Sequence, residues 1–382
     1  MTLKVLSIFD GFFVGGSRVV HSDIVAKLHE DYEQVHSVLS LTSKVSREYT
    51  TQRAENTETW KNLKSVGVDV FALDRTQDEP FTNEDIQTIK EAISKADVIL
   101  SLKEQPLVDL YKINAIPDDK PLIVSIHRSD PEHQGSGLQE LVELSRIKKN
   151  LKIIACAQAA KKAYVEAGIP ETVIEVVENG IDLSVFRPDA EVRSSLRQQI
   201  GASDDDPVIA IAARFDEMKN VPLFVHSSWE FFKLHPNAKF IACGAGMTKD
   251  NPAFQKLLDK HLPERFQKDF HALGIVKTAD IYPAADIVSL TSSFGEAAPL
   301  CILEAMACGA IPVSTDVGDT VLMVKGNGFI TNSSAVEIAQ VWKTAFKNRK
   351  NLQTGLSQRR DSLSDSHMVK SYVTVIERLV RK

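Results

Sequence analysis

The chain has 382 residues, of which 43% are hydrophobic and 25% are charged, a composition typical of an ordinary soluble protein with two domains. The formal net charge of −6 argues against nucleic acid as the main partner, because no basic excess is present to neutralise phosphates. No uncharged apolar run approaches the ~18 residues needed to span a bilayer, and the start of the chain resembles a strand rather than a signal peptide, so we expect a cytoplasmic protein.

Short β-branched runs alternate with amphipathic stretches along the chain, which is typical of parallel α/β sheets. In the first half we expect strands at Lys4–Ile8, Val35–Leu39, Val70–Leu73, Val98–Ser101, Leu122–Ile126 and Lys152–Ala155. In the second half we expect strands at Val208–Ala213, Lys239–Cys243, His271–Ile275, Ile287–Leu290 and Ile311–Ser314. Each set is predicted to form a separate doubly wound sheet.

A glycine pair, Gly15 and Gly16, lies between the first strand and its helix. The surrounding segment does not follow the G-x-G-x-x-G pattern, so a dinucleotide-binding fingerprint is absent. Paired glycines still allow the backbone to approach a ligand closely, although a tight turn alone would also explain them.

His127 follows the fifth strand, at the carboxyl end where parallel sheets bind ligands. The alternatives are an ordinary loop histidine and a metal pair with His133, for which the spacing gives no support. Farther along lies a small basic cluster, Arg146, Lys148, Lys149 and Lys152, which either has no special role or meets an anionic acceptor or a membrane surface.

Periodic structure lapses between Glu178 and Pro188, where an Asn-Gly turn precedes a proline, and this indicates a domain boundary. After the first strand of the second half come Arg214 and Lys219, two cations that can both reach one diphosphate. Asp204–Asp206 precedes that strand and is interpreted as a solvated turn rather than a metal site.

Two glutamates eight positions apart, Glu296 and Glu304, flank the start of a predicted helix marked by Pro299 and ended by Gly309. The backbone N–H groups of Leu300 and Cys301 have no partner inside such a helix, so they form a seat for a phosphate. A phosphate-binding position between two carboxylates that can accept hydrogen bonds from hydroxyl groups indicates a nucleotide sugar. The alternative is an ordinary strand–loop–helix unit with two surface glutamates.

The segment from Glu296 to Glu304 resembles the E-x7-E motif of retaining glycosyltransferases of the GT-B fold, family four in particular. The Arg214/Lys219 spacing and the string from Glu178 to Pro188 are similar to other elements of that family. The resemblance implies two Rossmann-like domains facing a central cleft, an acceptor-side domain at 1–180 and a nucleotide-sugar domain at 181–364. It also implies that a helix at 365–382 crosses back to the first domain.

The resemblance also implies roles for single residues. Catalysis is assigned to His127, near the transferred sugar, to Glu296, which takes the sugar hydroxyls, and to Arg214 and Lys219, which stabilise the leaving diphosphate. The implied donor-binding residues share a position around the nucleotide sugar and are Gly15, Gly16, Arg214, Lys219, Gly244, Ile275, Glu296, Ala298, Leu300, Cys301 and Glu304.

These roles predict transfer of a sugar with retention from a nucleoside-diphosphate sugar, with UDP favoured and GDP next, to a hydroxyl acceptor. The acceptor is expected to be a cell-surface glycan or glycolipid precursor, or else a soluble sugar, cyclitol or secondary metabolite. Neither a metal nor a cofactor is expected, and membrane contact is at most peripheral. Two other interpretations stay open, a nucleotide-sugar 2-epimerase on the same scaffold and a binding-only module.

Overall fold

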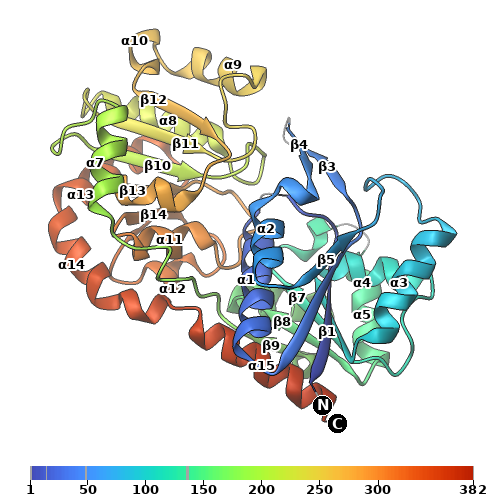
Figure 1. The fold of residues 1–382 in the computed structure, drawn as a ribbon. Coiled ribbons are helices and arrows are strands. Elements are labelled where there is room, and N and C mark those ends of the chain that lie inside the picture. Colours follow the sequence, from blue (N-terminus) through green and yellow to red (C-terminus); the bar gives the residue numbers. More distant parts are fainter. Residues whose placement is uncertain (1, 14, 48–49, 135–136, 382) are drawn as a thin grey trace. The chain divides into compact units, whose positions relative to one another are not determined.

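The computed structural model describes residues 2–13, 15–47, 50–134 and 137–381, and the chain divides into two compact units. The first unit comprises residues 1–47, 51–179 and 366–382, and the second is formed mainly by residues 180–365. Both units are built of parallel strands and helices in alternation (Figure 1).

The first unit contains a seven-stranded sheet in the order β5-β2-β1-β6-β7-β8-β9. Its strands are β1 (Leu3–Phe9), β2 (Gln34–Ser40), β5 (Asp69–Ala72), β6 (Val98–Leu102), β7 (Leu122–Ile126), β8 (Leu151–Ala155) and β9 (Ile174–Val176). The helices are α1 (Gly16–Asp31), α2 (Glu58–Ser65), α3 (Asn83–Lys95), α4 (Glu104–Lys112), α5 (Gly137–Ile147), α6 (Gln158–Glu166) and α15 (Ser366–Val380). A separate two-stranded sheet pairs β3 (Lys44–Arg47) with β4 (Thr50–Arg53).

The second unit contains a six-stranded sheet in the order β12-β11-β10-β13-β14-β15. Its strands are β10 (Val208–Ala212), β11 (Lys239–Cys243), β12 (Phe270–Gly274), β13 (Ile287–Leu290), β14 (Ile311–Thr315) and β15 (Phe329–Thr331). The helices are α7 (Ala190–Gln199), α8 (Val221–Phe232), α9 (Pro252–His261), α10 (Glu264–Gln267), α11 (Leu300–Ala307), α12 (Thr320–Val324), α13 (Ala335–Lys347) and α14 (Arg349–Arg359).

Every strand expected from the sequence is present, with ends displaced by at most one residue. Strands β3, β4, β9 and β15 were not expected. They have only three or four residues each and lie at sheet edges or in a separate hairpin, so the continuous apolar run that marks a central strand is missing.

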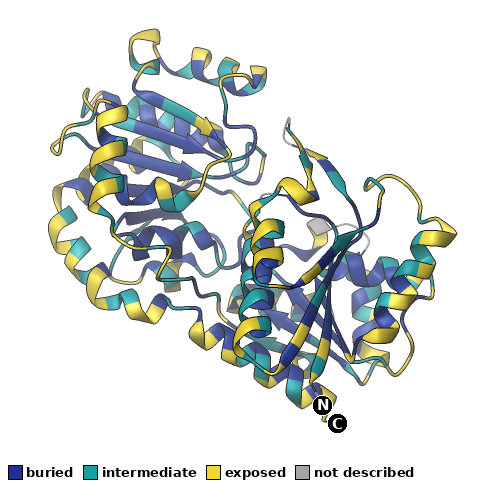
Figure 2. Cartoon of the chain, viewed as in Figure 1, coloured by how far each residue is buried: buried dark blue, intermediate teal, exposed yellow. Residues whose placement is uncertain are grey.

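The central strands of both sheets are buried, while the outer faces of the helices are exposed (Figure 2). In the second unit an aromatic cluster fills the space between α8, α13 and the sheet. Trp342 from α13 packs edge-on to Phe224 and Phe231 of α8, and its indole N–H donates to Ser289 Oγ at 3.2 Å. The buried indole nitrogen therefore has the partner that it needs.

The last helix, α15, belongs to the first unit although it follows the second in sequence. The hydroxyl groups of Tyr372 and Ser125, on α15 and β7, lie 3.0 Å apart in a hydrogen bond, and α15 also packs against α1 (Figure 1). Burial raises the pKa of Tyr372 above its ordinary value, so the phenol remains neutral. Near the end of the helix, Arg378 forms an ion pair with Glu175 of β9.

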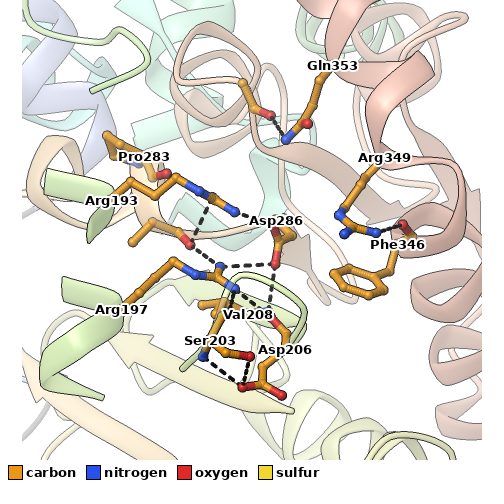
Figure 3. Close-up of polar contacts among 12 residues, drawn as sticks. Arg193, Arg197, Ser203, Asp206, Val208, Pro283, Asp286, Phe346, Arg349 and Gln353 are labelled. Atoms are coloured by element: carbon orange, nitrogen blue, oxygen red, sulfur yellow. Dashed lines mark hydrogen bonds and ion pairs between the residues drawn. The ribbon is translucent and has the colours of Figure 1, made fainter. Parts of the chain in front are cut away.

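A buried carboxylate attaches α7 to the second sheet (Figure 3). Asp286, directly before β13, is fully buried, and its oxygens accept from Arg193 Nη2 at 2.9 Å and Arg197 Nη1 at 3.2 Å. The backbone N–H of Val208 also donates to Asp286 Oδ2, at 3.0 Å. One carboxylate therefore joins a helix and two neighbouring strands.

Replacing Asp286 with Asn should lower the free energy of unfolding of the second unit by about 3–5 kcal/mol, because the buried Arg197 guanidinium and the partly exposed Arg193 guanidinium lose their counter-charge. Urea denaturation monitored by circular dichroism measures the change. Asp205→Asn, an exposed carboxylate on the neighbouring turn, is the matched control and should leave the value within about 0.5 kcal/mol. Equal effects of the two substitutions would contradict the structural role of Asp286.

Candidate functional site

The topology of each sheet marks the edge where a ligand binds. Strand β1 lies between β2 and β6, and β10 lies between β11 and β13, so the direction of winding reverses beside these two strands. Doubly wound sheets bind ligands at the carboxyl ends of the strands at such a point. The residues that follow β1 and β10 are therefore the first to consider.

Two of the predicted residues, Lys219 and Glu296, meet in the second unit. Lys219 lies in the loop between β10 and α8, and its Nζ forms an ion pair with Glu296 Oε1. Ser292 Oγ donates to the same oxygen at 2.6 Å. Glu296 is only 6% exposed, so this carboxylate is a buried, partnered group rather than the surface glutamate of the alternative interpretation.

Asp216 connects the two predicted cations. Its Oδ2 forms an ion pair with Arg214 Nη1 at 2.8 Å, and its Oδ1 accepts from the backbone N–H of Lys219 at 2.9 Å. Both Arg214 and Lys219 are thus fixed by one turn. Sequence reasoning missed Asp216, although its place between the two cations was the available signal.

The helix predicted to begin at Pro299 is present as α11, and its start is shifted by one residue. The helix begins at Leu300, and Pro299 occupies the N-cap with φ −65° and ψ 120° instead of the first helical position. Gly309 follows the helix with φ 82°, the left-handed conformation that ends helices. The first N–H groups of α11, those of Leu300 and Cys301, are not used by the helix itself. Burial raises the pKa of the Cys301 thiol to about 12, so it remains neutral beside them.

The loop that carries Glu296 and Ala298 rests on Gly318. This glycine has φ 57°, and a Cβ there would lie 2.5 Å from the carbonyl oxygen of Glu296. The neighbouring Asp319 N–H donates to the carbonyl of Ala297 at 2.8 Å. Sequence reasoning missed Gly318, because its role depends on a contact with a loop twenty residues earlier.

The predicted nucleotide loops lie together at the ends of β11 and β12. The Gly244 N–H donates to the carbonyl of Gly274 at 2.7 Å, and a Cβ on Gly244 would lie 2.7 Å from the carbonyl carbon of Ala213. Ile275 follows directly and is 44% exposed. Glu304, on α11, accepts a hydrogen bond from Thr278 Oγ1 at 2.9 Å.

In the first unit, Gly15 is the N-cap of α1 and Gly16 its first residue. Two residues later, Arg18 is 2% exposed, forms an ion pair with Asp10 at the end of β1, and donates from Nε to the carbonyl of Gly11 at 2.7 Å. The glycine turn therefore lies between the two members of a charge pair, a buried arginine and a partly exposed aspartate, that sequence reasoning did not identify.

His127 directly follows β7, as predicted, and its imidazole is neutral. Burial, with the positive charges of Lys103 and Arg18 nearby, brings the pKa of its imidazole to about 3. The ring is therefore uncharged at physiological pH and has a nitrogen able to accept a hydrogen bond. The side chain of His133 lies outside the described residues. Within the part of the chain that the structure describes, no group of three or more His, Cys, Asp and Glu side chains is arranged to hold a metal ion.

The basic cluster of Arg146, Lys148, Lys149 and Lys152 lies around the end of α5 and the start of β8. Lys152 follows the first residue of β8 and donates to the carbonyl of Thr172 at 2.8 Å. Arg146 donates to the carbonyl of Gly168 at 3.0 Å, and Lys148 forms an ion pair with Asp118. These cations are engaged locally, away from the carboxyl ends of the strands.

Part of the second unit is similar to a known protein family. Residues 192–359 match the family model described as glycosyl transferases group 1. These residues are a group 1 glycosyltransferase domain. The match includes Arg214, Lys219, Glu296 and Glu304, all within the second unit.

Curated relatives match the same part of this chain. Alpha-monoglucosyldiacylglycerol synthase of Acholeplasma laidlawii is 30% identical over 168 residues, which is 42% of this chain and 40% of that protein. D-inositol 3-phosphate glycosyltransferase of Kribbella flavida is 29% identical over 174 residues, 41% of this chain and 40% of that protein. The chain thus spans about two fifths of the length of the curated relatives it matches.

Solved structures extend the similarity to the whole chain. Anabaena HepE in complex with UDP-glucose superposes with a TM-score of 0.78 at 20% identity, covering 98% of this chain and 99% of that one. A glycosyltransferase from Rickettsia africae gives a TM-score of 0.78 at 17% identity, covering 100% and 99%. The predicted GT-B fold, with two Rossmann-like halves, is confirmed.

Gly318→Ala should destabilise the second unit, because the new methyl group meets the carbonyls of the Glu296 loop. Gly326→Ala is the matched control, since Gly326 also has positive φ (79°) but no neighbour within 4 Å of a Cβ. The control should cost about 1–2 kcal/mol from backbone strain, and Gly318→Ala about 1–3 kcal/mol more. Urea denaturation measures both, and identical losses would contradict the contact argument.

Proposed function

We propose that this protein is a retaining glycosyltransferase that transfers a sugar from a nucleoside-diphosphate sugar to a hydroxyl acceptor. The observation that carries the proposal is the meeting of Lys219 and Glu296 beside the start of α11, within a group 1 glycosyltransferase domain. Cations, unused N–H groups and a carboxylate together suit a diphosphate linked to a polyhydroxylated sugar.

The positively charged groups of the site are assigned to the leaving diphosphate. As the bond between sugar C1 and the β-phosphate oxygen breaks, negative charge grows on the phosphate. Arg214, Lys219 and the N–H groups at Leu300 and Cys301 are assigned to stabilise that charge. Asp216 holds the Arg214 guanidinium and the backbone of Lys219 in place, and Glu296 holds the Lys219 ammonium, so little reorganisation accompanies the reaction.

The carboxylates account for the sugar and the ribose. Glu296 is assigned to the hydroxyls of the transferred sugar and Glu304 to those of the ribose. The acceptor oxygen attacks C1 on the face from which the diphosphate departs, and its proton passes to the departing phosphate oxygen. Glu296 is already paired with Lys219, so it serves in recognition rather than as a covalent nucleophile.

UDP is the favoured nucleotide and GDP the next candidate. The support is that UDP-glucose is bound in Anabaena HepE and UDP in a complex of the Staphylococcus aureus protein TarM, both with similar folds. The exposed Ile275 and the main-chain groups near Gly244 and Gly274 are assigned to the base, and main-chain contacts provide no side-chain code that separates uracil from guanine.

The acceptor is assigned to the first unit, near Gly15, Gly16 and His127. A lipid-linked or cell-surface glycan acceptor is favoured, because relatives include a monoglucosyldiacylglycerol synthase and an Arabidopsis phosphatidylinositol N-acetylglucosaminyltransferase subunit. The inositol phosphate relatives support the alternative of a small soluble acceptor. Among the described residues, no helix is both long and apolar enough to span a bilayer.

A 2-epimerase remains the second candidate, since a carboxylate-lined nucleotide-sugar site also suits that reaction. Incubation of the purified protein with UDP-N-acetylglucosamine alone separates the two. Appearance of the C2 epimer without any acceptor would favour the epimerase.

A panel of nucleotides should raise the melting temperature selectively, with UDP giving the largest shift. A ligand that binds only the folded state adds RT ln(1 + [L]/Kd), about 2.7 kcal/mol at one hundred times Kd. Differential scanning fluorimetry with UDP, GDP, ADP and CDP at equal concentration measures the order. Stabilisation by GDP and not by UDP would overturn the assigned donor.

Lys219→Ala should reduce kcat by on the order of 10²-fold or more, the usual loss when a donor that stabilises transition-state charge is removed. Release of nucleoside diphosphate from the donor chosen by the panel gives the rate. Lys256→Ala removes an exposed lysine of α9 in the same unit and should leave kcat unchanged. Near-normal turnover of Lys219→Ala would exclude Lys219 from the chemistry.

A further inference from the structure

The carboxylate of Glu304 is held from outside its own helix. Thr278 Oγ1 donates to Glu304 Oε2 at 2.9 Å. Thr278 is the first residue of a short 3₁₀ helix, η4 (Thr278–Asp280), that follows β12. Glu304 is 8% exposed, and a carboxylate this deeply buried needs hydrogen-bond donors to offset its loss of water.

Neutral and apolar groups pack beside this carboxylate. Burial, with the negative charge of Glu304, raises the pKa of Cys243 and of Cys308 to about 12, so both remain uncharged thiols. Cys308 also belongs to a hydrophobic cluster with Tyr282 and Ala305. Thiols are weak donors, so the hydroxyl of Thr278 is a much stronger orienting partner than these neighbours.

The loop that carries Thr278 is itself fixed by main-chain hydrogen bonds. The Gly274 N–H donates to the carbonyl of Met247 at 2.8 Å, and the Ile281 N–H donates to the carbonyl of Thr278 at 3.0 Å. The same loop presents Ile275, the residue assigned to the base. One rigid segment therefore both faces the assigned base position and holds the carboxylate assigned to the ribose.

We propose that Thr278 is a positioning residue for ribose recognition, whose hydroxyl orients Glu304 so that the carboxylate accepts the ribose 2′- and 3′-hydroxyls. This rests on the proposed function, because it takes Glu304 as the ribose-binding group. Thr278 does not touch the reacting atoms and is not a catalytic residue.

The test is the ratio of dissociation constants for 2′,3′-dideoxy-UDP and UDP, measured by isothermal titration calorimetry. If the nucleotide panel selects GDP, the guanosine pair replaces the uridine pair. The parent protein should bind UDP on the order of 10–100-fold more tightly than 2′,3′-dideoxy-UDP, which is the usual contribution of hydrogen bonds to a charged group. Thr278→Val keeps the side-chain shape but removes the hydroxyl. It should lower the ratio about tenfold through weaker UDP binding, with unchanged binding of the dideoxy nucleotide.

Two further variants make the result specific. Thr278→Ser retains the hydroxyl and should restore the parent ratio. Thr344→Val makes the same change on an exposed turn of α13, where the hydroxyl donates to the carbonyl of Gln340, and should leave the ratio unchanged. Circular dichroism checks folding, and Thr278→Ala replaces Thr278→Val if that variant does not fold.

Glu304→Gln separates failure of this inference from failure of the proposed function. A lower ratio in Glu304→Gln together with a parental ratio in Thr278→Val would overturn the role of Thr278 alone. A parental ratio in Glu304→Gln would remove Glu304 from ribose binding and overturn both.

Discussion

The ion pair between Lys219 and Glu296 is the interaction on which the second unit's site depends. A carboxylate with 6% exposure is stable only when its charge is compensated, and the compensation here comes from a loop nearly eighty residues earlier in the chain. Ser292 donates to the same oxygen, and the carbonyl of Ser292 in turn accepts from Thr315 Oγ1 at 2.6 Å. The ends of β10, β13 and β14 are thereby joined through one group. Under the proposed function, a donor molecule that binds here exchanges one set of charged partners for another, so no uncompensated charge is created.

The two units place a charge pair at the same topological position but in different states. After β1, Asp10 is paired with Arg18, whose side chain is 2% exposed and stacks over the ring of Phe13 at 3.3 Å. After β10, Asp216 is paired with Arg214, whose side chain is 21% exposed. A guanidinium buried between an aromatic ring and a carboxylate is a structural element, whereas a partly exposed one on a turn remains accessible to a phosphate. The aspartate–arginine pair thus supports a loop in the first unit, whereas in the second unit it leaves the arginine accessible.

The longer strands and the helix at 300–307 follow from local signals, because β-branched runs and a proline–glycine pair act over a few residues. Asp216, Gly318 and Thr278 were not found in this way. Gly318 is needed only because the Glu296 carbonyl approaches it, and Thr278 matters only because the short helix η4 after β12 lies beside α11. Such partners are set by the register of crossovers, which no local pattern encodes. The one exception is Asp216, whose place between two cations was visible in the sequence.

The proposed acceptor site in the first unit is not supported by the family match, because that match lies wholly in the second unit. In the first unit, Lys103 follows β6 with φ 70° and ψ 173°, a region that residues other than glycine rarely adopt and that costs about 1–3 kcal/mol. Its N–H donates to the carbonyl of Ser125 at 2.9 Å, and its own carbonyl accepts from Ser101 Oγ at 2.8 Å, so the surrounding strands enforce the conformation. Strand β6 is the neighbour of β1 at the point where winding reverses, and the positive charge of Lys103 contributes to keeping His127 neutral. Strained backbone conformations of this kind cluster at functional sites, where the direction of a side chain matters more than the stability lost to strain. The residues that choose the acceptor are therefore to be sought around Lys103 and His127, and donor chemistry around Lys219 and Glu296.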